Sequence, residues 1–206
     1  MIKRLITAVG MILISSNCFA YSDDELIKAL KKGGYNIFFR HSITDGEDPK
    51  KINPPNEKIG DCNSQRQLNP RGKNQARSIG HKFRIHGIPV GNVYSSPFCR
   101  CQETAQLAFG KVFVVNWMVV KQKNDRLREL ESHLKTAPSS DVVNGIPLLK
   151  NNIYVGHAVT LTQSLLGSSF PVISLREGEG IVFDPRTNQY LGRIYPSGWS
   201  DKNSRI

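Results

Sequence analysis

The chain has 206 residues, with 28 lysines and arginines against 17 acidic residues and a formal net charge of +11. This length is typical of one domain with a sizeable core, and neither an internal repeat nor a low-complexity tract suggests a second domain. The basic excess favours anionic partners or a solvated basic surface. Nucleic acid is not expected as a partner, because the sequence has no finger, basic zipper or aromatic–basic alternation.

The first twenty residues have the three parts of a secretory signal peptide. Lys3 and Arg4 form a basic region, residues 5–14 are apolar, and small or polar residues lead to Ala20. The apolar run is too short to span a membrane, and no comparable run follows it. We expect cleavage near Ala20, one domain over 21–206, and a periplasmic or secreted product without a transmembrane segment. A lipoprotein signal is the less favoured alternative, because Asn17 precedes Cys18.

Helix and strand signals alternate along the remaining chain. Helices are expected to begin after Ser22 or Asp23, at Asn69-Pro70, at Pro97 and at Asn124, with another over 158–166. Strands are expected at 35–39, 92–95, 112–115 or 112–120, and 153–156. The segments 42–68 and 138–152 are interpreted as loops, and 180–183 with 190–194 as a closing hairpin.

This alternation predicts an α/β fold, with a mainly parallel central sheet, helices on both faces and a closing hairpin at the C-terminus. In such sheets, the residues that follow the strands meet at one edge. Arg40 and His41 follow one strand, His157 follows another, and Arg100 lies near a helix start. Together they match a phosphate site, because guanidinium groups hold phosphate oxygens with paired hydrogen bonds and histidine can attack phosphorus.

Four ordered motifs strengthen this hypothesis. They are residues 39–44 (FRHSIT), 68–76 (LNPRGKNQA), 95–105 (SSPFCRCQETA) and 155–157 (VGH). In content and order they resemble branch 1 of the histidine phosphatase superfamily, which includes phosphoglycerate mutases. The similarity extends over residues 37–158, and one departure is Ser42, where the family usually has glycine.

The resemblance implies a metal-independent phosphoric monoester hydrolase without a cofactor, in which a phosphohistidine forms on His41. Arg40, Arg100 and His157 are implied to bind the phosphoryl group, and the phosphate-binding set also includes Ser42 and Thr44. The remaining histidines, His81, His86 and His133, lack the spacing of metal ligands, so no metal site is expected.

The proton donor is less well defined by the sequence. Glu129, in the stretch Leu127-Arg128-Glu129, resembles the family's acid but lacks the residues that usually follow it. Asp45 and Glu177 are the alternatives.

The stretch from Asp61 to Arg66, together with the signal, resembles exported family members, some of which act on phosphates of the lipopolysaccharide core. The expected substrate is therefore a phosphorylated small molecule or glycan. Three other functions remain open: a catalytically idle anion-binding protein of the same fold, a mutase, and a nucleic-acid binder. The mutase is less favoured because its bisphosphorylated cofactor belongs in the cytoplasm.

Three cysteines follow the signal, namely Cys62, Cys99 and Cys101, an odd number for an oxidising compartment. Cys99 and Cys101 are two positions apart at a helix start, so they point to different faces and do not bridge each other comfortably. We predict a disulfide between Cys62 and Cys99 that holds the loop 42–68 against the phosphate site. A Cys62–Cys101 bridge and three reduced thiols are the alternatives.

Overall fold

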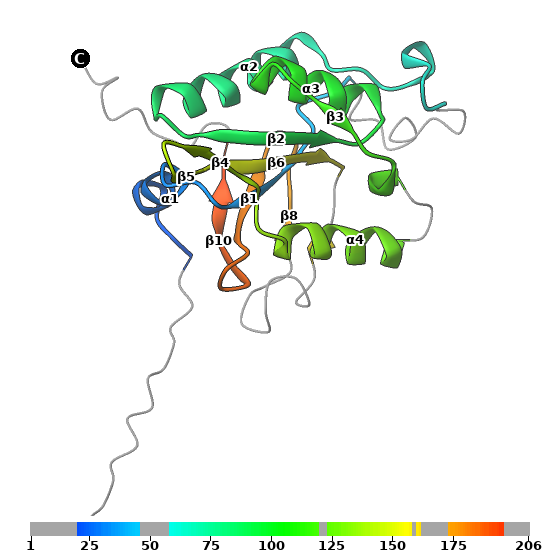
Figure 1. Cartoon of the computed structure of the whole chain (residues 1–206). Coiled ribbons are helices and arrows are strands. Elements are labelled where there is room, and N and C mark those ends of the chain that lie inside the picture. The colour runs from blue at the N-terminus through cyan, green and yellow to red at the C-terminus, as the bar shows by residue number, and fades with distance from the viewer. Residues whose placement is uncertain (1–19, 46–57, 120–122, 158–159, 162–172, 196–206) are drawn as a thin grey trace, which may run out of the picture.

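The computed structural model describes residues 20–45, 58–119, 123–157, 160–161 and 173–195. At its centre lies a six-stranded sheet with the order β10-β9-β1-β6-β2-β3 (Figure 1). The strands are β1 (Asn36–Arg40), β2 (Val90–Ser95), β3 (Phe113–Val114), β6 (Asn151–Gly156), β9 (Gly180–Asp184) and β10 (Gln189–Ile194). The pairs β1–β6, β6–β2 and β2–β3 are parallel, whereas β9 is antiparallel to both β1 and β10. The predicted parallel sheet and closing hairpin are therefore confirmed.

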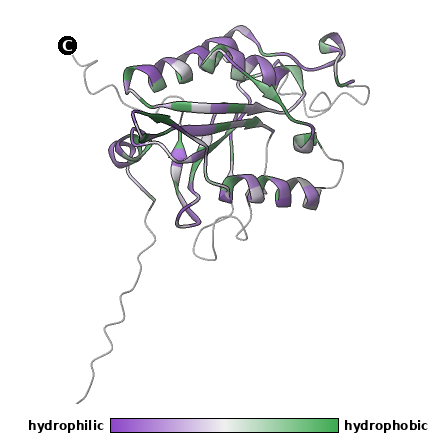
Figure 2. Ribbon diagram, viewed as in Figure 1, coloured by the Kyte–Doolittle hydropathy of each residue, from purple (hydrophilic) through white to green (hydrophobic). Residues whose placement is uncertain are grey.

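Helices cover both faces of this sheet, also as predicted. They are α1 (Asp23–Leu30), α2 (Pro70–Ile85), α3 (Cys99–Phe109) and α4 (Lys123–Lys135). Side chains of α1, α2 and α3 share one buried cluster with Phe39, whereas α4 shares a second cluster with Phe38. Neighbouring residues of β1 thus point into opposite cores. The outward faces of α2 and α4 are mainly hydrophilic (Figure 2).

Local sequence signals explain where two helices begin. Ser22 and Glu25 form a reciprocal capping box at the start of α1. Asn69 caps α2 by accepting a hydrogen bond from the backbone N–H of Gly72, and proline follows at the first helical position. The same helix packs closely on α3 because Gly80 has no side chain: a Cβ there would lie 1.8 Å from the carbonyl oxygen of Ala108.

Two predicted boundaries are wrong. The expected loop 138–152 contains a two-stranded hairpin, β4 (Ser140–Val143) and β5 (Ile146–Leu149), and its last two residues already belong to β6. Asn144 and Gly145 connect the strands with positive φ angles of 53° and 77°, as a tight primed hairpin turn requires. The strand that could have continued to residue 120 gives way to a 3₁₀ helix over Asn116–Val119.

The predicted helix 158–166 is also contradicted where the structure describes it. Thr160–Leu161 form strand β7, which pairs antiparallel with β8 (Ile173–Ser174). This pairing satisfies backbone groups that a helix would have satisfied internally. The rest of that segment, the signal residues 1–19 and residues 46–57 of the long loop lie outside the described residues.

None of the helices in the described part of the chain is long and apolar enough to cross a membrane.

Candidate active site

His41 and His157 lie side by side because β1 and β6 are parallel neighbours. Arg40 is in register with Gly156, so the residue after each strand emerges at the same edge of the sheet. The two imidazole rings are 5.8 Å apart between centroids. Two backbone hydrogen bonds fix the position of His41. Its N–H donates to the carbonyl oxygen of Gly156 at 2.9 Å, and its own carbonyl oxygen accepts from the N–H of Gly178 at 2.9 Å.

His41 is buried, and its surroundings favour the neutral imidazole. Its Nδ1 lies 2.9 Å from the carbonyl oxygen of Ser42, which can only accept a hydrogen bond, so Nδ1 carries the proton and Nε2 keeps a lone pair. Burial lowers the pKa of this imidazole well below its ordinary value, although the Ser42 carbonyl opposes the effect. The positive charges of Arg100 and Arg40 and the neighbouring His157 lower it further. A neutral Nε2 is the form that can attack phosphorus.

Two guanidinium groups line the same site. Arg100, in the first turn of α3, is buried, and its guanidinium carbon lies 4.6 Å from the ring centre of Phe98. Arg40 donates from Nη1 to the carbonyl oxygen of Leu175 at 2.9 Å, while its Nη2 lies 3.5 Å from Glu177 Oε1. These contacts fix the planes of both side chains, which suits bidentate binding of an oxyanion.

His157 is oriented by Ser96 and Arg100. Its Nε2 lies 2.8 Å from the hydroxyl of Ser96, and its Nδ1 lies 3.5 Å from Nη2 of Arg100. Its ring is nearly perpendicular to that of Phe98, with centroids 5.0 Å apart. The structure thus brings together the four predicted residues that carry an imidazole or guanidinium group.

Nε of Arg40 and the hydroxyl of Ser42 are buried at this site, and neither has a hydrogen-bond partner among the described residues. A buried polar group without a partner costs about 1–3 kcal/mol, so such groups at a cationic site fit an anionic ligand that supplies acceptors. The backbone of Ser42 is fixed independently, because its N–H donates to the hydroxyl of Thr104 at 3.0 Å.

Glu177 is the carboxylate that the structure places at this site. It accepts a 2.9 Å hydrogen bond from the Thr44 hydroxyl, and its Oε1 lies 3.9 Å from Nδ1 of His41. Gln75 links the two loops involved, donating to the carbonyl oxygen of Glu177 at 3.1 Å and accepting from the N–H of Ile43 at 3.1 Å. The Thr44 side chain is therefore connected to the site by its hydrogen bond to Glu177.

The other two carboxylates that the sequence offered are exposed. Glu129 lies on the solvent side of α4, and no contact within the described residues links it to His41. Asp45 is exposed just beyond Thr44. The role of Glu129 as proton donor stays a prediction. No group of three metal-ligating side chains is found in the part of the chain that the structure describes.

Residues 37–133 match the family model of the histidine phosphatase superfamily, branch 1. Over this segment the chain is similar to the superfamily. Solved structures share the fold of this chain at low identity. A putative phosphohistidine phosphatase SixA from Agrobacterium tumefaciens is 18% identical, with a TM-score of 0.52 over 79% of this chain and 99% of that chain.

Two further structures with this fold have TM-scores of 0.50. A protein histidine phosphatase SixA, complexed with tungstate, is 12% identical over 79% of this chain and 97% of its own. TTHB049 from Thermus thermophilus is 13% identical over 78% of this chain and 99% of its own. No curated protein matches the sequence.

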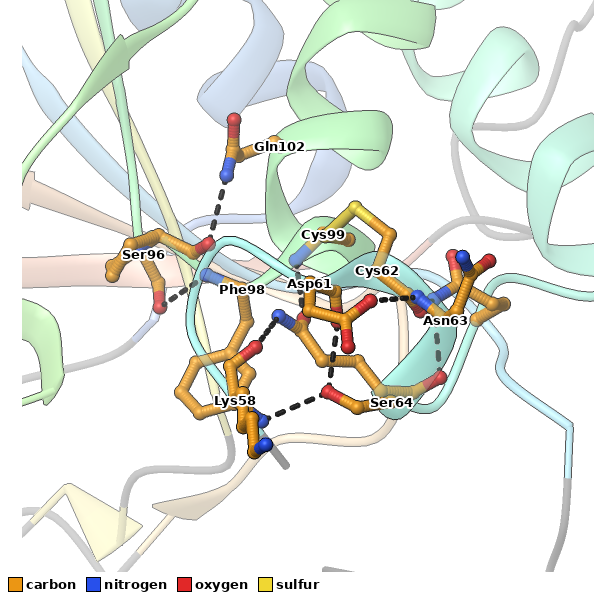
Figure 3. Close-up of a disulfide and its surroundings, with 12 residues drawn as sticks. Lys58, Asp61, Cys62, Asn63, Ser64, Ser96, Phe98, Cys99 and Gln102 are labelled. Atoms are coloured by element: carbon orange, nitrogen blue, oxygen red, sulfur yellow. Dashed lines mark hydrogen bonds between the residues drawn. A yellow bond between two sulfur atoms is a disulfide. The ribbon is translucent and has the colours of Figure 1, made fainter. Parts of the chain in front are cut away.

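A disulfide joins Cys62 to Cys99, as predicted (Figure 3). Cys101 is buried and takes no part in this bridge. The bridge attaches residues 58–68 to the start of α3. Gln65 strengthens this attachment, because its Oε1 accepts the N–H of Cys99 at 2.8 Å, where the N-cap residue Phe98 provides no side-chain cap. This role of Gln65 was not predicted, because it has no local signature in the sequence. The long loop thereby fixes the turn of helix that carries Arg100.

The disulfide should make a large contribution to stability. It closes a span of 37 residues, and the double substitution Cys62→Ala/Cys99→Ala should lower the free energy of unfolding by about 4 kcal/mol. Urea unfolding under oxidising conditions measures the loss. Dithiothreitol should destabilise the wild type by a similar amount and leave the double variant unchanged. Equal stability of variant and oxidised wild type would contradict this prediction.

The lowered pKa of His41 should make stability depend on pH. An unfolded histidine has a pKa of about 6.5, so below that pH the unfolded chain binds a proton that the folded protein does not. The free energy of unfolding should then fall by up to about 1.4 kcal/mol per pH unit from this group. Urea unfolding of the wild type and of His41→Asn, above and below that pH, isolates the effect. Identical losses in both proteins would show that folding does not keep His41 neutral.

Proposed function

We propose that the protein is an exported phosphomonoesterase that hydrolyses phosphate esters through a phosphohistidine on His41. The observation that carries this proposal is a buried histidine whose pKa is lowered, beside His157 and two fixed guanidinium groups. A nucleophile with its lone pair available at neutral pH and a surrounding set of cationic donors are what attack on a phosphate ester needs.

The reaction proceeds in two displacements. Nε2 of His41 attacks phosphorus, and the bond between phosphorus and the ester oxygen breaks as the leaving group departs on the opposite side. Arg40, Arg100 and His157 bind the phosphoryl oxygens and stabilise the charge of the transition state. Water then attacks the phosphohistidine, releasing inorganic phosphate and restoring the neutral imidazole.

Glu177 is proposed as the proton donor, because its carboxylate lies 3.5 Å from Nη2 of Arg40, one of the groups that bind the phosphoryl oxygens in this mechanism. Its Oε1 lies 3.9 Å from Nδ1 of His41, whereas Glu129 is exposed on α4. The protonated carboxyl donates to the ester oxygen, and the resulting carboxylate accepts a proton from the attacking water.

Export and a phosphorylated small-molecule or glycan substrate complete the proposal. The signal pattern of residues 1–20 supports secretion of a single domain over 21–206, and a disulfide is typical of oxidising compartments. The related SixA structure complexed with tungstate, a tetrahedral oxyanion like phosphate, supports phosphoryl chemistry. Some of the exported relatives that the sequence resembles act on phosphates of the lipopolysaccharide core, so these phosphates are among the proposed substrates.

Replacement of His41 tests the mechanism. His41→Ala should abolish turnover of p-nitrophenyl phosphate, because the nucleophile is lost, while the circular dichroism spectrum stays unchanged. Brief incubation of the wild type with labelled substrate should trap acid-labile, base-stable phosphate on His41. The matched control is His81→Ala, at an exposed histidine of α2, which should keep wild-type turnover. A folded wild type that binds phosphate without turnover would instead identify an idle anion-binding protein.

The proton donor can be assigned from the leaving group. Glu177→Gln should slow hydrolysis of alkyl phosphates by about 10²-fold or more, and that of aryl phosphates much less, because only a poor leaving group needs protonation. Comparison of kcat/KM for both ester classes measures this difference. Glu129→Gln serves as the matched control on α4. A selective loss in Glu129→Gln, with none in Glu177→Gln, would assign the role to Glu129.

A further inference from the structure

The β4–β5 hairpin exposes an unusual amount of apolar surface. The exposed fraction rises along it from 38% at Leu149 through 49% at Leu148 to 69% at Ile146, so the hairpin projects from the domain. Val142 and Val143 on the opposite strand are 67% and 54% exposed. Contiguous apolar patches are uncommon on the surfaces of soluble monomers and mark sites of protein or membrane contact.

Both faces of the tip are apolar. Val143 is opposite Ile146, and Val142 is opposite Pro147, while consecutive residues of a strand point to opposite faces. Val142 and Val143 therefore project on opposite sides, and each is more than half exposed. A flat protein surface could cover one face only. An apolar medium that surrounds the tip covers both.

The surroundings of the hairpin are basic. Its one acidic side chain, Asp141, is paired with Lys150. The backbone of Gly34 donates to the carbonyl oxygen of Lys150 at 3.1 Å, which brings the exposed Lys31 and Lys32 to the base of the hairpin. Without the charges of Lys3 and Arg4, the formal net charge of +11 becomes +9. This charge opposes association with a second copy and complements an anionic surface.

We propose that the tip of the β4–β5 hairpin inserts into the surface of an anionic lipid membrane, with Lys31 and Lys32 at the headgroups. The combination of apolar side chains that enter the interface and lysines that contact anionic lipid is the general requirement for peripheral membrane binding. The hairpin precedes β6, whereas His157 follows it, so the tip and the active site lie toward opposite ends of the parallel strands (Figure 1). A protein bound in this way presents its active site to the water.

Co-sedimentation with lipid vesicles tests the proposal without any measurement of turnover. The wild type should bind vesicles of phosphatidylcholine with phosphatidylglycerol and bind pure phosphatidylcholine much more weakly. Val142→Asn/Ile146→Asn should lower the partition coefficient on the order of tenfold or more, because two exposed aliphatic side chains no longer enter the interface. Lys31→Gln/Lys32→Gln should lower it roughly fivefold for each lysine lost.

The matched control is Ile59→Asn, at an isoleucine that is 55% exposed and lies outside the hairpin, which should bind as the wild type does. All proteins compared carry the same amino terminus, so a retained signal segment contributes equally. Equal vesicle binding by the wild type and the Val142→Asn/Ile146→Asn variant would overturn the proposal, as would no binding by the wild type. A hairpin-dependent dimer in analytical ultracentrifugation, without vesicle binding, would overturn it in favour of a second copy.

Discussion

The parallel pairing of β1 with β6 is the constraint on which the site depends. It brings His41 and His157 to one edge of the sheet, and the antiparallel pairing of β1 with β9 brings Glu177 to the other side of His41. Because side chains alternate along a strand, a one-residue slip of β1 would exchange Phe38 and Phe39 between two separate cores. The packing of these two rings thus enforces the register that places His41 beside His157.

The electrostatics of the site follow from this placement. Burial removes water from His41 and disfavours its charged form, and the nearby guanidinium groups of Arg40 and Arg100 act in the same direction. Holding these cations together in a partly buried site is unfavourable, and Glu177 offsets part of the cost. A dianionic ligand would offset more of it, and any ligand that binds only the folded protein also stabilises that state.

Patterns that are local in sequence predicted the main-sheet strands, the four helices and the convergence of the motif residues. Helical geometry excluded a bridge between Cys99 and Cys101, and the preference for Cys99 over Cys101 as the partner of Cys62 was confirmed by the structure. Two features depend on contacts between distant segments and were less accessible. Thr160–Leu161 form a strand only through pairing with β8, and Glu177 reaches His41 through the register of β9. The β4–β5 hairpin did carry a local signal, the dipeptide Asn144-Gly145, which the interpretation as a loop overlooked.

The position of Cys101 has a consequence for the order of events during oxidative folding. In an extended chain Cys99 and Cys101 are almost equally distant from Cys62 in sequence, so loop closure hardly distinguishes them. Formation of α3 creates the difference, because it buries the Cys101 side chain against the main-chain carbonyl of Gly156 and leaves Cys99 facing residues 58–68. Once α3 has formed, oxidation therefore favours the Cys62–Cys99 bridge. A chain oxidised too early through Cys101 would have to draw that residue out of the core, away from the strand end that bears His157.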